Sequence, residues 1–475
     1  MLDVAIIGGG IIGCATAERL SQYQLKTAVV ERANDVADGT TKANSGIVHA
    51  GYDAPEGTLM ARLNLEGSRL MSEECGRLNV PLRRTGSYVL AFTPEDEEHL
   101  QRLLARGQKN GVSGLEILDG ETVRRREPSL SRDVRAALWA PAAAVVDPFQ
   151  LCAAYAQVAA QNGTEFLLGH EVQALSWNGD HWDIQTNQGT VEARYVINAA
   201  GVHADQIQAM TGTSEFTITP VRGEYYLMDK ALGDLVSAVI FQCPGPEGKG
   251  VLVAPTVHGN LIVGPNAEAV NSRDDTGTTR EGQEFVRNMA AKSVPDINYR
   301  EAIRNFAGVR ANSDIRDFII GMSETAPNFL NLAGICSPGL SSAPAIARMA
   351  VQLLEGVGLR LMLNEGASDS RQVIRIRDLP PDEKQQRIQE NPLYGRVLCR
   401  CESITEGEIC DAIHTSPQPR TVDGIKKRCG TGMGRCQGGF CLPRILDVLC
   451  RELGCAPEDV LLNRDGSQIL TGELP

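Results

Sequence analysis

Val4-Ala5-Ile6-Ile7-Gly8-Gly9-Gly10-Ile11-Ile12-Gly13 is the stretch that decides the fold of this chain. An apolar run enters a triple glycine, and small or apolar residues then recur at helical spacing, which predicts a strand, a tight turn and a helix. The next apolar run, residues 27–30, ends in Glu31, near the spacing of the ribose-binding acid in a dinucleotide-binding βαβ unit. We expect Gly8 to permit the turn, Gly10 to let the backbone approach a pyrophosphate, and Gly13 to let helix and strand pack closely. The stretch therefore predicts a dinucleotide site, with a plain turn between strand and helix as the alternative.

The length and charge of the chain limit the classes of partner that it can bind. Its 475 residues suffice for two or three domains, and 42% hydrophobic residues is ordinary for a globular protein. A formal net charge of −13 argues against nucleic acid or an anionic membrane surface, because both are bound by clustered Lys and Arg. No apolar run reaches the roughly 18 residues of a transmembrane segment, and Asp3 without a basic region argues against a signal peptide. We expect a cytoplasmic protein whose partners are small molecules and other proteins.

A second stretch, residues 40–52 (TTKANSGIVHAGY), is rich in small and hydroxyl side chains that suit close approach to a planar ring or a phosphate. Together with the first strand and Glu31, it resembles the FAD-dependent amino-acid-oxidase-like superfamily, in its branch of glycerol-3-phosphate and L-2-hydroxyglutarate dehydrogenases. The resemblance implies FAD as the dinucleotide and places this stretch along the isoalloxazine ring. Besides Gly8, Gly10, Gly13 and Glu31, it implies cofactor contacts at Thr41, Asn44, Ser45, Gly46, Val172, Ala200, Gly201, Gly334, Pro338, Gly339 and Leu340.

The order of the expected elements gives an α/β fold of three parts. Helices are predicted over 60–78, 94–111, 149–161 and 343–355, and strands over 86–92, 165–173, 220–226, 250–255 and 260–265. We expect a Rossmann-like FAD-binding domain from residues 1–80, 145–215 and 305–365, beside an antiparallel-sheet substrate domain from 81–144 and 216–304. A polar linker over 366–390 then leads to a small helical domain over 391–475.

Eight of the 13 cysteines lie between Cys399 and Cys455. A local cluster in a chain without a secretion signal favours metal binding over a disulfide framework. The pattern is Cys399-Arg-Cys401, then the glycine-rich Cys436-Gln-Gly-Gly-Phe-Cys441. Structural zinc sites usually present CxxC pairs, whereas four thiolates approached by backbone N–H groups suit a [2Fe-2S] cluster. The sequence therefore favours iron–sulfur, and zinc or free thiols are the alternatives.

This C-terminal module resembles bacterioferritin-associated-ferredoxin-like (BFD-like) domains in its CRCE start, its Glu-Ile pair at 408–409 and its GMGRCQGGFC ending. The resemblance implies Cys399, Cys401, Cys436 and Cys441 as the ligands and leaves Cys429 as a competitor for the third position. Basic residues surround these ligands in sequence: Arg400, Lys426, Lys427, Arg428 and Arg435. We expect them to offset the charge of the cluster and raise its potential, and a solvated basic face is the alternative.

A flavin and a one-electron cluster on one chain suggest that a substrate loses two electrons, which then leave one at a time. A neutral histidine suits removal of a hydroxyl proton, and His49 lies in the ring segment, where base, covalent tether of FAD and simple ring neighbour are three alternatives. Arg310 in FAGVR matches the arginine that binds the substrate anion in the family, and its fork suits a phosphate or carboxylate. Weaker candidates for the substrate site are Arg222, Tyr52 and His258. The alternative for Arg222 is a structural role in a buried ion pair, and the alternative for His258 is that it is an ordinary turn residue.

The joint architecture is similar to the large subunit of anaerobic glycerol-3-phosphate dehydrogenases. It implies FAD-dependent oxidation of sn-glycerol 3-phosphate to dihydroxyacetone phosphate, with electrons passing through the [2Fe-2S] cluster to a separate redox protein or quinone-linked acceptor. Oxidation of an L-2-hydroxy acid such as L-2-hydroxyglutarate is the first alternative, followed by an amine or imino-acid substrate. An electron-transfer subunit without its own substrate is a further alternative. Peripheral attachment at the inner membrane through a partner stays open.

Overall fold

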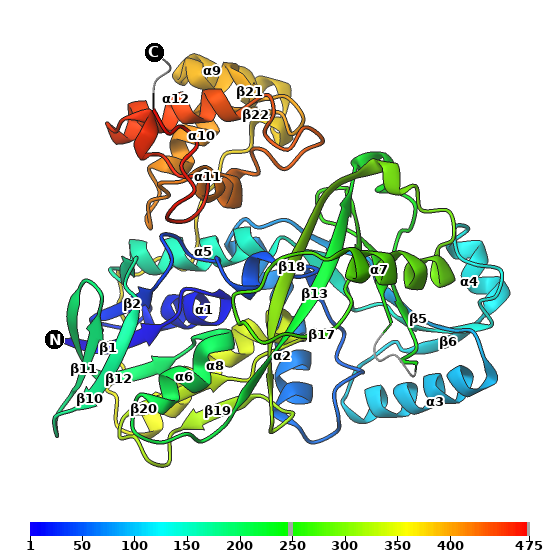
Figure 1. Cartoon of the computed structure of the whole chain (residues 1–475), viewed down its shortest axis with the longest axis horizontal. Helices are drawn as coiled ribbons and strands as arrows, with labels where there is room; N and C mark the ends of the chain where they lie inside the picture. The colour runs from blue at the N-terminus through cyan, green and yellow to red at the C-terminus, as the bar shows by residue number, and fades with distance from the viewer. Residues whose placement is uncertain (246–249, 473–475) are drawn as a thin grey trace.

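The computed structural model describes residues 1–245 and 250–472, which form two halves and a small C-terminal domain (Figure 1). Twelve α-helices are present in these residues: α1 (Ile11–Leu20), α2 (Leu59–Arg77), α3 (Pro94–Lys109), α4 (Gly120–Arg126), α5 (Pro148–Gln161), α6 (Ala204–Ala209), α7 (Arg280–Ser293), α8 (Gly339–Gly356), α9 (Pro381–Glu390), α10 (Glu406–Ile413), α11 (Val422–Cys429) and α12 (Leu442–Leu453). None of them is both long and apolar enough to cross a membrane.

The flavin half is built on an eight-stranded sheet. Its parallel core has the order β12, β1, β2, β9, with β20 beside β12, and the antiparallel strands β10, β11 and β19 complete it. The bounds are β1 (Leu2–Ile7), β2 (Thr27–Glu31), β9 (Glu165–Leu168), β10 (Val172–Trp177), β11 (Trp182–Thr186), β12 (Gly189–Asn198), β19 (Ile319–Met322) and β20 (Phe329–Ala333). Apolar runs such as VAII form the buried parallel strands because both of their faces are covered.

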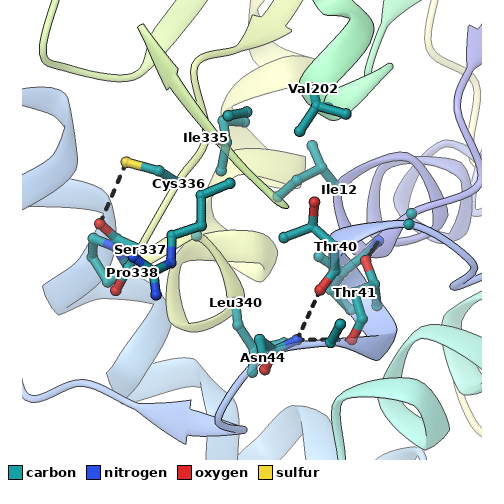
Figure 2. Close-up of a pocket in the computed structure, with 18 of the residues that line it drawn as sticks. Ile12, Thr40, Thr41, Asn44, Val202, Ile335, Cys336, Ser337, Pro338 and Leu340 are labelled. Atoms are coloured by element: carbon teal, nitrogen blue, oxygen red, sulfur yellow. Dashed lines mark hydrogen bonds between the residues drawn. The ribbon is translucent and has the colours of Figure 1, made fainter. Parts of the chain in front are cut away.

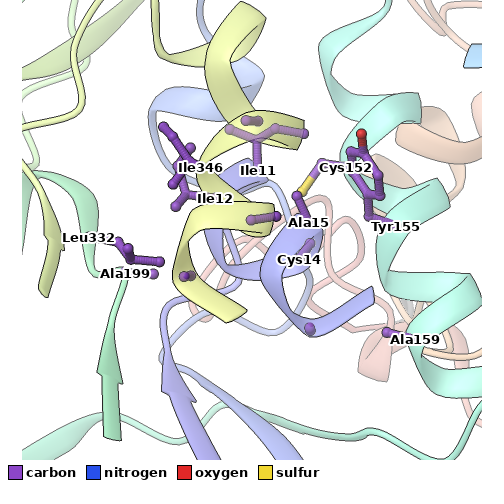
Figure 3. Close-up of a cluster of buried hydrophobic side chains, with 14 of the residues drawn as sticks. Ile11, Ile12, Cys14, Ala15, Cys152, Tyr155, Ala159, Ala199, Leu332 and Ile346 are labelled. Carbon is purple, nitrogen blue, oxygen red and sulfur yellow. The ribbon is translucent and has the colours of Figure 1, made fainter. Parts of the chain in front are cut away.

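Helix α1 lies between α5 and α8 in the core of this half (Figure 3). Ile11, Ile12 and Ala15 pack with Tyr155 of α5 and Ile346 of α8, and this set of small and medium side chains allows the three helices to approach closely. Two expectations need correction here. The strand expected over 165–173 is two strands, broken by a turn at Gly169, whose φ is +73°. The helix expected over 343–355 begins earlier, at Gly339, and contains Pro344 in its first turns.

The substrate half is a nine-stranded sheet in the order β17, β13, β16, β15, β14, β5, β7, β6, with β18 along the other edge of β13. Its bounds are β5 (Ser87–Ala91), β6 (Glu116–Asp119), β7 (Ala136–Ala140), β13 (Ile218–Met228), β14 (Val239–Gln242), β15 (Leu252–Pro255), β16 (Leu261–Gly264), β17 (Glu268–Ala269) and β18 (Ala302–Ser313). The sheet is antiparallel except for the parallel pair β14 and β5. Residues 305–313, which we expected in the flavin domain, instead extend this sheet as most of β18.

A three-stranded sheet of β3 (Ile47–Val48), β8 (Ala144–Val146) and β4 (Leu82–Arg84) connects the two halves. The C-terminal domain is mainly helical and adds the short pair β21 (Val397–Cys399) and β22 (Ile404–Thr405). Its own apolar core gathers α10, α11 and α12, and α11 packs against α5 of the flavin half. The segment 366–390, expected to be a linker, contains a short 3-10 helix and α9. Its Arg371 is buried and donates to the carbonyl oxygen of Leu78, so part of the segment is fixed to the flavin half.

Candidate functional site

A cavity of about 740 Å³ lies between the two halves. One wall comes from the glycine turn, β2, the 40–49 segment and residues 335–340, and the opposite wall comes from strands of the nine-stranded sheet. It contains most of the residues expected to bind FAD: Gly8, Gly10, Glu31, Thr41, Asn44, Ser45, Val172, Ala200, Gly201, Pro338, Gly339 and Leu340. Gly13, Gly46 and Gly334 do not line this cavity, and Gly46 lines a second one instead. This arrangement allows an extended dinucleotide to run from the strand ends to the substrate sheet.

The glycine turn has the geometry that close backbone packing requires. Gly8 has φ +114°, and a Cβ there would lie 2.4 Å from the carbonyl oxygen of Ala199. A Cβ on Gly13 would lie only 1.9 Å from the carbonyl oxygen of Gly8, so Gly13 allows α1 to pack on the turn. At Gly10 the nearest neighbour of such a Cβ would be the Thr41 hydroxyl at 3.3 Å. The start of α1 is thus open to an anionic group, which its N-terminal dipole favours.

Glu31 lies at the end of β2 and lines the cavity. Its carboxylate accepts hydrogen bonds from the backbone N–H of Gly9 at 2.5 Å and of Ala33 at 2.8 Å. Burial raises the pKa of this carboxyl, and the two N–H donors partly oppose that shift. The carboxylate is therefore held at the turn, in the position where a ribose-binding acid belongs.

The 40–46 segment forms a hydrogen-bonded turn at the cavity wall (Figure 2). The Asn44 amide donates to the carbonyl oxygen of Thr41 at 2.7 Å and accepts from the backbone N–H of Gly46 at 2.8 Å. The Thr41 hydroxyl accepts from the backbone N–H of Ile11 at 3.0 Å, which ties the segment to the start of α1. Facing it, Ser337, Pro338 and Leu340 lead into α8, so two helix N-termini border the same cavity.

His49 and Arg310 both line this cavity. Nε2 of His49 lies 3.3 Å from the Ser337 hydroxyl, and its ring stacks on Phe241 with a centroid distance of 5.7 Å. The Arg310 guanidinium donates to the carbonyl oxygen of Asn266 at 3.2 Å, and within the described chain it forms no ion pair. Gly223 leaves room for it, since a Cβ there would lie 2.4 Å from the guanidinium. A half-buried cation with no carboxylate partner is suited to bind an anion in the cavity.

The other substrate candidates are placed differently. Arg222 does not line the cavity: its guanidinium is 2.8 Å from both Glu268 and Asp275 and 3.5 Å from Glu224, so it is the buried ion-pair residue of the alternative interpretation. His258 lies in the turn between β15 and β16, with Nε2 2.8 Å from a carboxylate oxygen of Asp147, away from the flavin cavity. Tyr52 does line the cavity, and burial raises the pKa of its phenol.

The structure adds cavity residues that sequence reasoning did not single out: Asp53, His99, Phe241, Gln242, Asn266 and Ser337. His99 lies on α3, and burial together with the nearby Arg102 lowers its pKa. Phe241 and Gln242 come from β14, which pairs with β5 from far earlier in the chain. Asp53 and Ser337 adjoin residues that the sequence had already indicated, whereas Phe241 and Gln242 have no local signal, because only the pairing of β14 with the distant β5 brings them to the cavity.

The four cysteines expected as cluster ligands come together at one end of the C-terminal domain. The sulfur atoms of Cys401 and Cys436 are 3.7 Å apart, and those of Cys399 and Cys441 are hydrogen-bonded. In the described chain, no three of these sulfur atoms lie within 4.8 Å of one another. A single tetrahedral zinc would require all four sulfurs at about 3.8 Å, given a Zn–S length of about 2.3 Å. Two separate pairs suit a cluster with two irons.

Backbone N–H groups point at the thiols, as a thiolate-bound cluster requires. Glu402 and Gly432 donate to the sulfur of Cys399, and Gly438 and Phe440 donate to that of Cys436. The hydrogen bond from the Cys441 thiol, with these backbone donors, lowers the pKa of Cys399 to about 6, and the same bond raises the pKa of Cys441.

The remaining cysteine near the ligands is oriented differently. The Cys429 thiol donates to the carbonyl oxygen of Ile425 in its own helix, and burial raises its pKa to about 12. We therefore keep Cys399, Cys401, Cys436 and Cys441 as the candidate ligands.

The basic residues around the ligands differ in their partners. Arg428 and Lys427 pair with Asp35 and Asp38 of the flavin half, Arg435 reaches Asp229 and Glu301, and Arg400 lies over the ring of Phe440. Among the described residues, Lys426 pairs only with Asp423, 3.9 Å away. Burial, with Arg304 and Lys42 nearby, lowers the pKa of Lys426 to about 8. It borders a second cavity of about 1,050 Å³ between the flavin half and the C-terminal domain, which His258 and Arg304 also line.

Two family models match the chain. The model described as FAD dependent oxidoreductase matches residues 3–353, and the model described as BFD-like [2Fe-2S] binding domain matches residues 397–451. The chain is 45% identical over 473 residues to a glycerol 3-phosphate dehydrogenase of Caloramator mitchellensis, which covers 99% of this chain and 98% of the relative. It is 28% identical to a mitochondrial L-2-hydroxyglutarate dehydrogenase of Caenorhabditis elegans, over 73% of this chain and 92% of the relative.

Among solved structures, the dithionite-reduced L-α-glycerophosphate oxidase of Mycoplasma pneumoniae with FAD bound matches with a TM-score of 0.75 and 31% identity, over 79% of this chain and 99% of that one. These matches confirm the α/β fold with its flavin and iron–sulfur parts. They also confirm both expected cofactors, FAD and a [2Fe-2S] cluster. With its dinucleotide turn, its cavity and its cysteine site, the chain belongs to the FAD dependent oxidoreductase family and carries a BFD-like [2Fe-2S] domain at its C-terminal end.

Proposed function

We propose that this enzyme oxidises sn-glycerol 3-phosphate to dihydroxyacetone phosphate and passes the electrons through its [2Fe-2S] domain to a separate acceptor. The observation that carries the proposal is the Arg310 guanidinium, which lies in the flavin cavity without a carboxylate partner in the described chain. A phosphate is a dianion that a guanidinium binds through two parallel hydrogen bonds. The full-length relative named a glycerol 3-phosphate dehydrogenase supports this substrate.

Different residues of the chain bind the substrate and remove its proton. FAD supplies a two-electron acceptor for the hydride that leaves C2 of the substrate. Arg310 holds the phosphate, and His49 takes the proton of the C2 hydroxyl at Nε2, the nitrogen that faces the Ser337 hydroxyl. The stack of His49 on Phe241 fixes the plane of the imidazole. The substrate thus loses one hydride and one proton and becomes a ketone.

The C-terminal domain supports electron release to a protein or quinone-linked acceptor. Cys401 and Cys436 are exposed, whereas Cys399 and Cys441 are buried. One edge of the cysteine site therefore faces solvent and the other faces the protein. A site with one exposed edge suits one-electron transfer to a partner that docks on the surface.

The first test is anaerobic reduction of the purified holoenzyme. We expect sn-glycerol 3-phosphate to bleach the flavin absorbance, followed by the appearance of the reduced-cluster signal in electron paramagnetic resonance. Bleaching by L-2-hydroxyglutarate alone would replace the proposal with the hydroxy-acid alternative, which the L-2-hydroxyglutarate dehydrogenase relative supports. Bleaching by neither compound, nor by an amine or imino-acid panel, would favour the electron-transfer subunit.

The second test separates the two electron centres. In a Cys436→Ser, Cys441→Ser variant, we expect the substrate to bleach the flavin as before while transfer to a one-electron acceptor protein or quinone analogue falls. Equal transfer in this variant and in the wild type would contradict the route through the cluster. The match to the BFD-like domain is the reason to expect that the cluster carries the electrons from the flavin to the acceptor.

A further inference from the structure

Helix α11 of the C-terminal domain contacts the loop that follows Glu31 in the flavin half. The two carboxylate oxygens of Asp35 each accept a hydrogen bond from the Arg428 guanidinium at 2.9 Å. The neighbouring Lys427 ammonium donates to the carbonyl oxygen of Val36 at 2.9 Å and to the carboxylate of Asp38 at 3.0 Å. We call Asp35, Lys427 and Arg428 the interdomain clamp.

The clamp is buried, unlike an ordinary surface ion pair. The exposed fractions of Asp35, Lys427 and Arg428 are 1%, 5% and 9%. The Arg428 guanidinium also donates to the carbonyl oxygens of Gly424 and Pro417, so both of its terminal nitrogens have partners in each of the two domains. Burial alone would raise the pKa of Asp35, but the two cations outweigh it and lower that pKa to about 2. Loss of one partner would leave an uncompensated buried charge, which is costly.

The other side of this loop belongs to the flavin cavity. Glu31, Arg32 and Ala33 line the cavity at the start of the loop, and residues 38–41 line it at the end. Between these two ends, the backbone N–H of Ala37 donates to the carbonyl oxygen of Gly9 in the glycine turn at 2.9 Å. Ala37 has a positive φ of +59°, which a residue with a side chain rarely adopts, so the loop needs contacts that hold it in place.

Helix α11 also leads directly into the cysteine site. It ends at Cys429 and is capped by Gly430, after which the N–H of Gly432 donates to the sulfur of Cys399. The contact between Asp35 and Arg428 therefore connects the loop that lines the flavin cavity to the helix that precedes the cysteine loop.

We propose that the C-terminal domain is a structural part of the FAD site: Lys427 and Arg428 are positioning residues that hold the 31–41 loop in its FAD-binding conformation. FAD binding and docking of the iron–sulfur domain are then coupled, and the coupling is reciprocal because both equilibria share one free energy. Bound FAD strengthens the docking of the domain, and the docked domain slows FAD release. The inference depends on FAD binding and not on the identity of the substrate.

The test measures FAD retention in the full-length holoprotein. We expect Arg428→Met and Asp35→Asn each to speed release of FAD, followed by free-flavin fluorescence after dilution, by about 10- to 100-fold. The double variant should release FAD no faster than either single variant, because both changes break the same contact. Visible circular dichroism of the bound flavin is the second readout, and it applies also if His49 tethers the cofactor.

Two controls separate this idea from general loss of stability. Lys230→Met removes another ion pair of the C-terminal domain, Lys230 of the substrate half to Glu402 at 2.8 Å, which does not contact the 31–41 loop. It should leave FAD release and the flavin dichroism unchanged, and Arg428→Lys, which keeps one charge, should restore part of the retention lost in Arg428→Met. If Arg428→Met does not fold, Lys427→Met removes only the contacts to Asp35, Val36 and Asp38. Wild-type FAD release and dichroism in Lys427→Met and Asp35→Asn would overturn the proposal while leaving FAD-dependent oxidation intact.

Discussion

Two arginines on neighbouring strands of the substrate sheet lie in opposite electrostatic surroundings. Arg310 of β18 faces the flavin cavity, whereas Arg222 of β13 is held by Glu224, Glu268 and Asp275. Their strands pair with Arg222 opposite Val309, so Arg222 and Arg310 point to opposite faces of the sheet. The two histidines differ in the same way, since His49 lines the cavity and His258 pairs with Asp147. A substrate role therefore depends on which partners a side chain already has.

The largest effect should follow loss of the cavity arginine. We expect Arg310→Met to lower kcat/KM for sn-glycerol 3-phosphate by about 1,000-fold, because two charge-assisted hydrogen bonds to the phosphate are lost. The measurement is anaerobic flavin reduction at increasing substrate concentration. Arg310→Lys should recover part of the loss, since it keeps the charge but not the fork.

Arg222→Met is the matched control for that experiment. It leaves three carboxylates without their cation, so we expect a lower free energy of unfolding by about 3 kcal/mol and little change in kcat/KM of the folded fraction. A loss of kcat/KM similar to that of Arg310→Met would break the distinction between the two faces of the sheet.

Substitution of the two histidines, His49 and His258, tests the same distinction between a cavity residue and an already paired residue, with a smaller expected effect. We expect His49→Gln to lower the rate constant of flavin reduction by about 100-fold, because the substrate hydroxyl loses its proton acceptor. Stopped-flow measurement of flavin reduction by the substrate gives this rate constant. His258→Gln removes only the contact to Asp147 at 2.8 Å and should leave this rate constant unchanged. If instead His258→Gln slows reduction and His49→Gln does not, the proton acceptor has been misassigned.

The sequence predicted the parts of this molecule that depend on local pattern. The glycine turn, Glu31 and the two cysteine pairs are contiguous motifs, so each could be located without knowledge of the fold. The partners of Arg222 and His258 could not, because Glu268, Asp275 and Asp147 are brought near by strand pairing and by the start of α5. The contact between Asp35 and Arg428 joins residues nearly 400 positions apart and has no signal in either segment.

The pH dependence of the unfolding free energy tests whether the Asp35 carboxylate of the interdomain clamp is stabilised by its cationic partners. The pKa of Asp35 is lowered from 3.8 to about 2 in the folded chain, so its ionised form stabilises the fold above pH 3.8, and this contribution is lost as pH falls towards 2. We expect wild type to exceed Asp35→Asn in unfolding free energy at pH 7, and the difference to shrink by about 2 kcal/mol below pH 4. Denaturant unfolding at several pH values measures it, and a difference independent of pH would show that the carboxylate charge contributes nothing.

The smallest effect is expected at Lys426, whose neighbour Lys427 is already paired with Asp35 and Asp38. Lys426 is half-buried, and the carboxylate paired with it in the described chain, Asp423, is 3.9 Å away, so its charge is less neutralised. A cation near the thiolates stabilises the reduced, more negative cluster. We therefore expect Lys426→Met to lower the midpoint potential of the cluster by tens of millivolts, on the order of the interaction of one partly screened charge with the cluster. Redox titration followed by electron paramagnetic resonance measures it, with Lys426→Arg as the charge-conserving control. Equal potentials in wild type and Lys426→Met would mean that the charge of Lys426 has no influence on the cluster and that Arg304 and Lys42 set the local field without it.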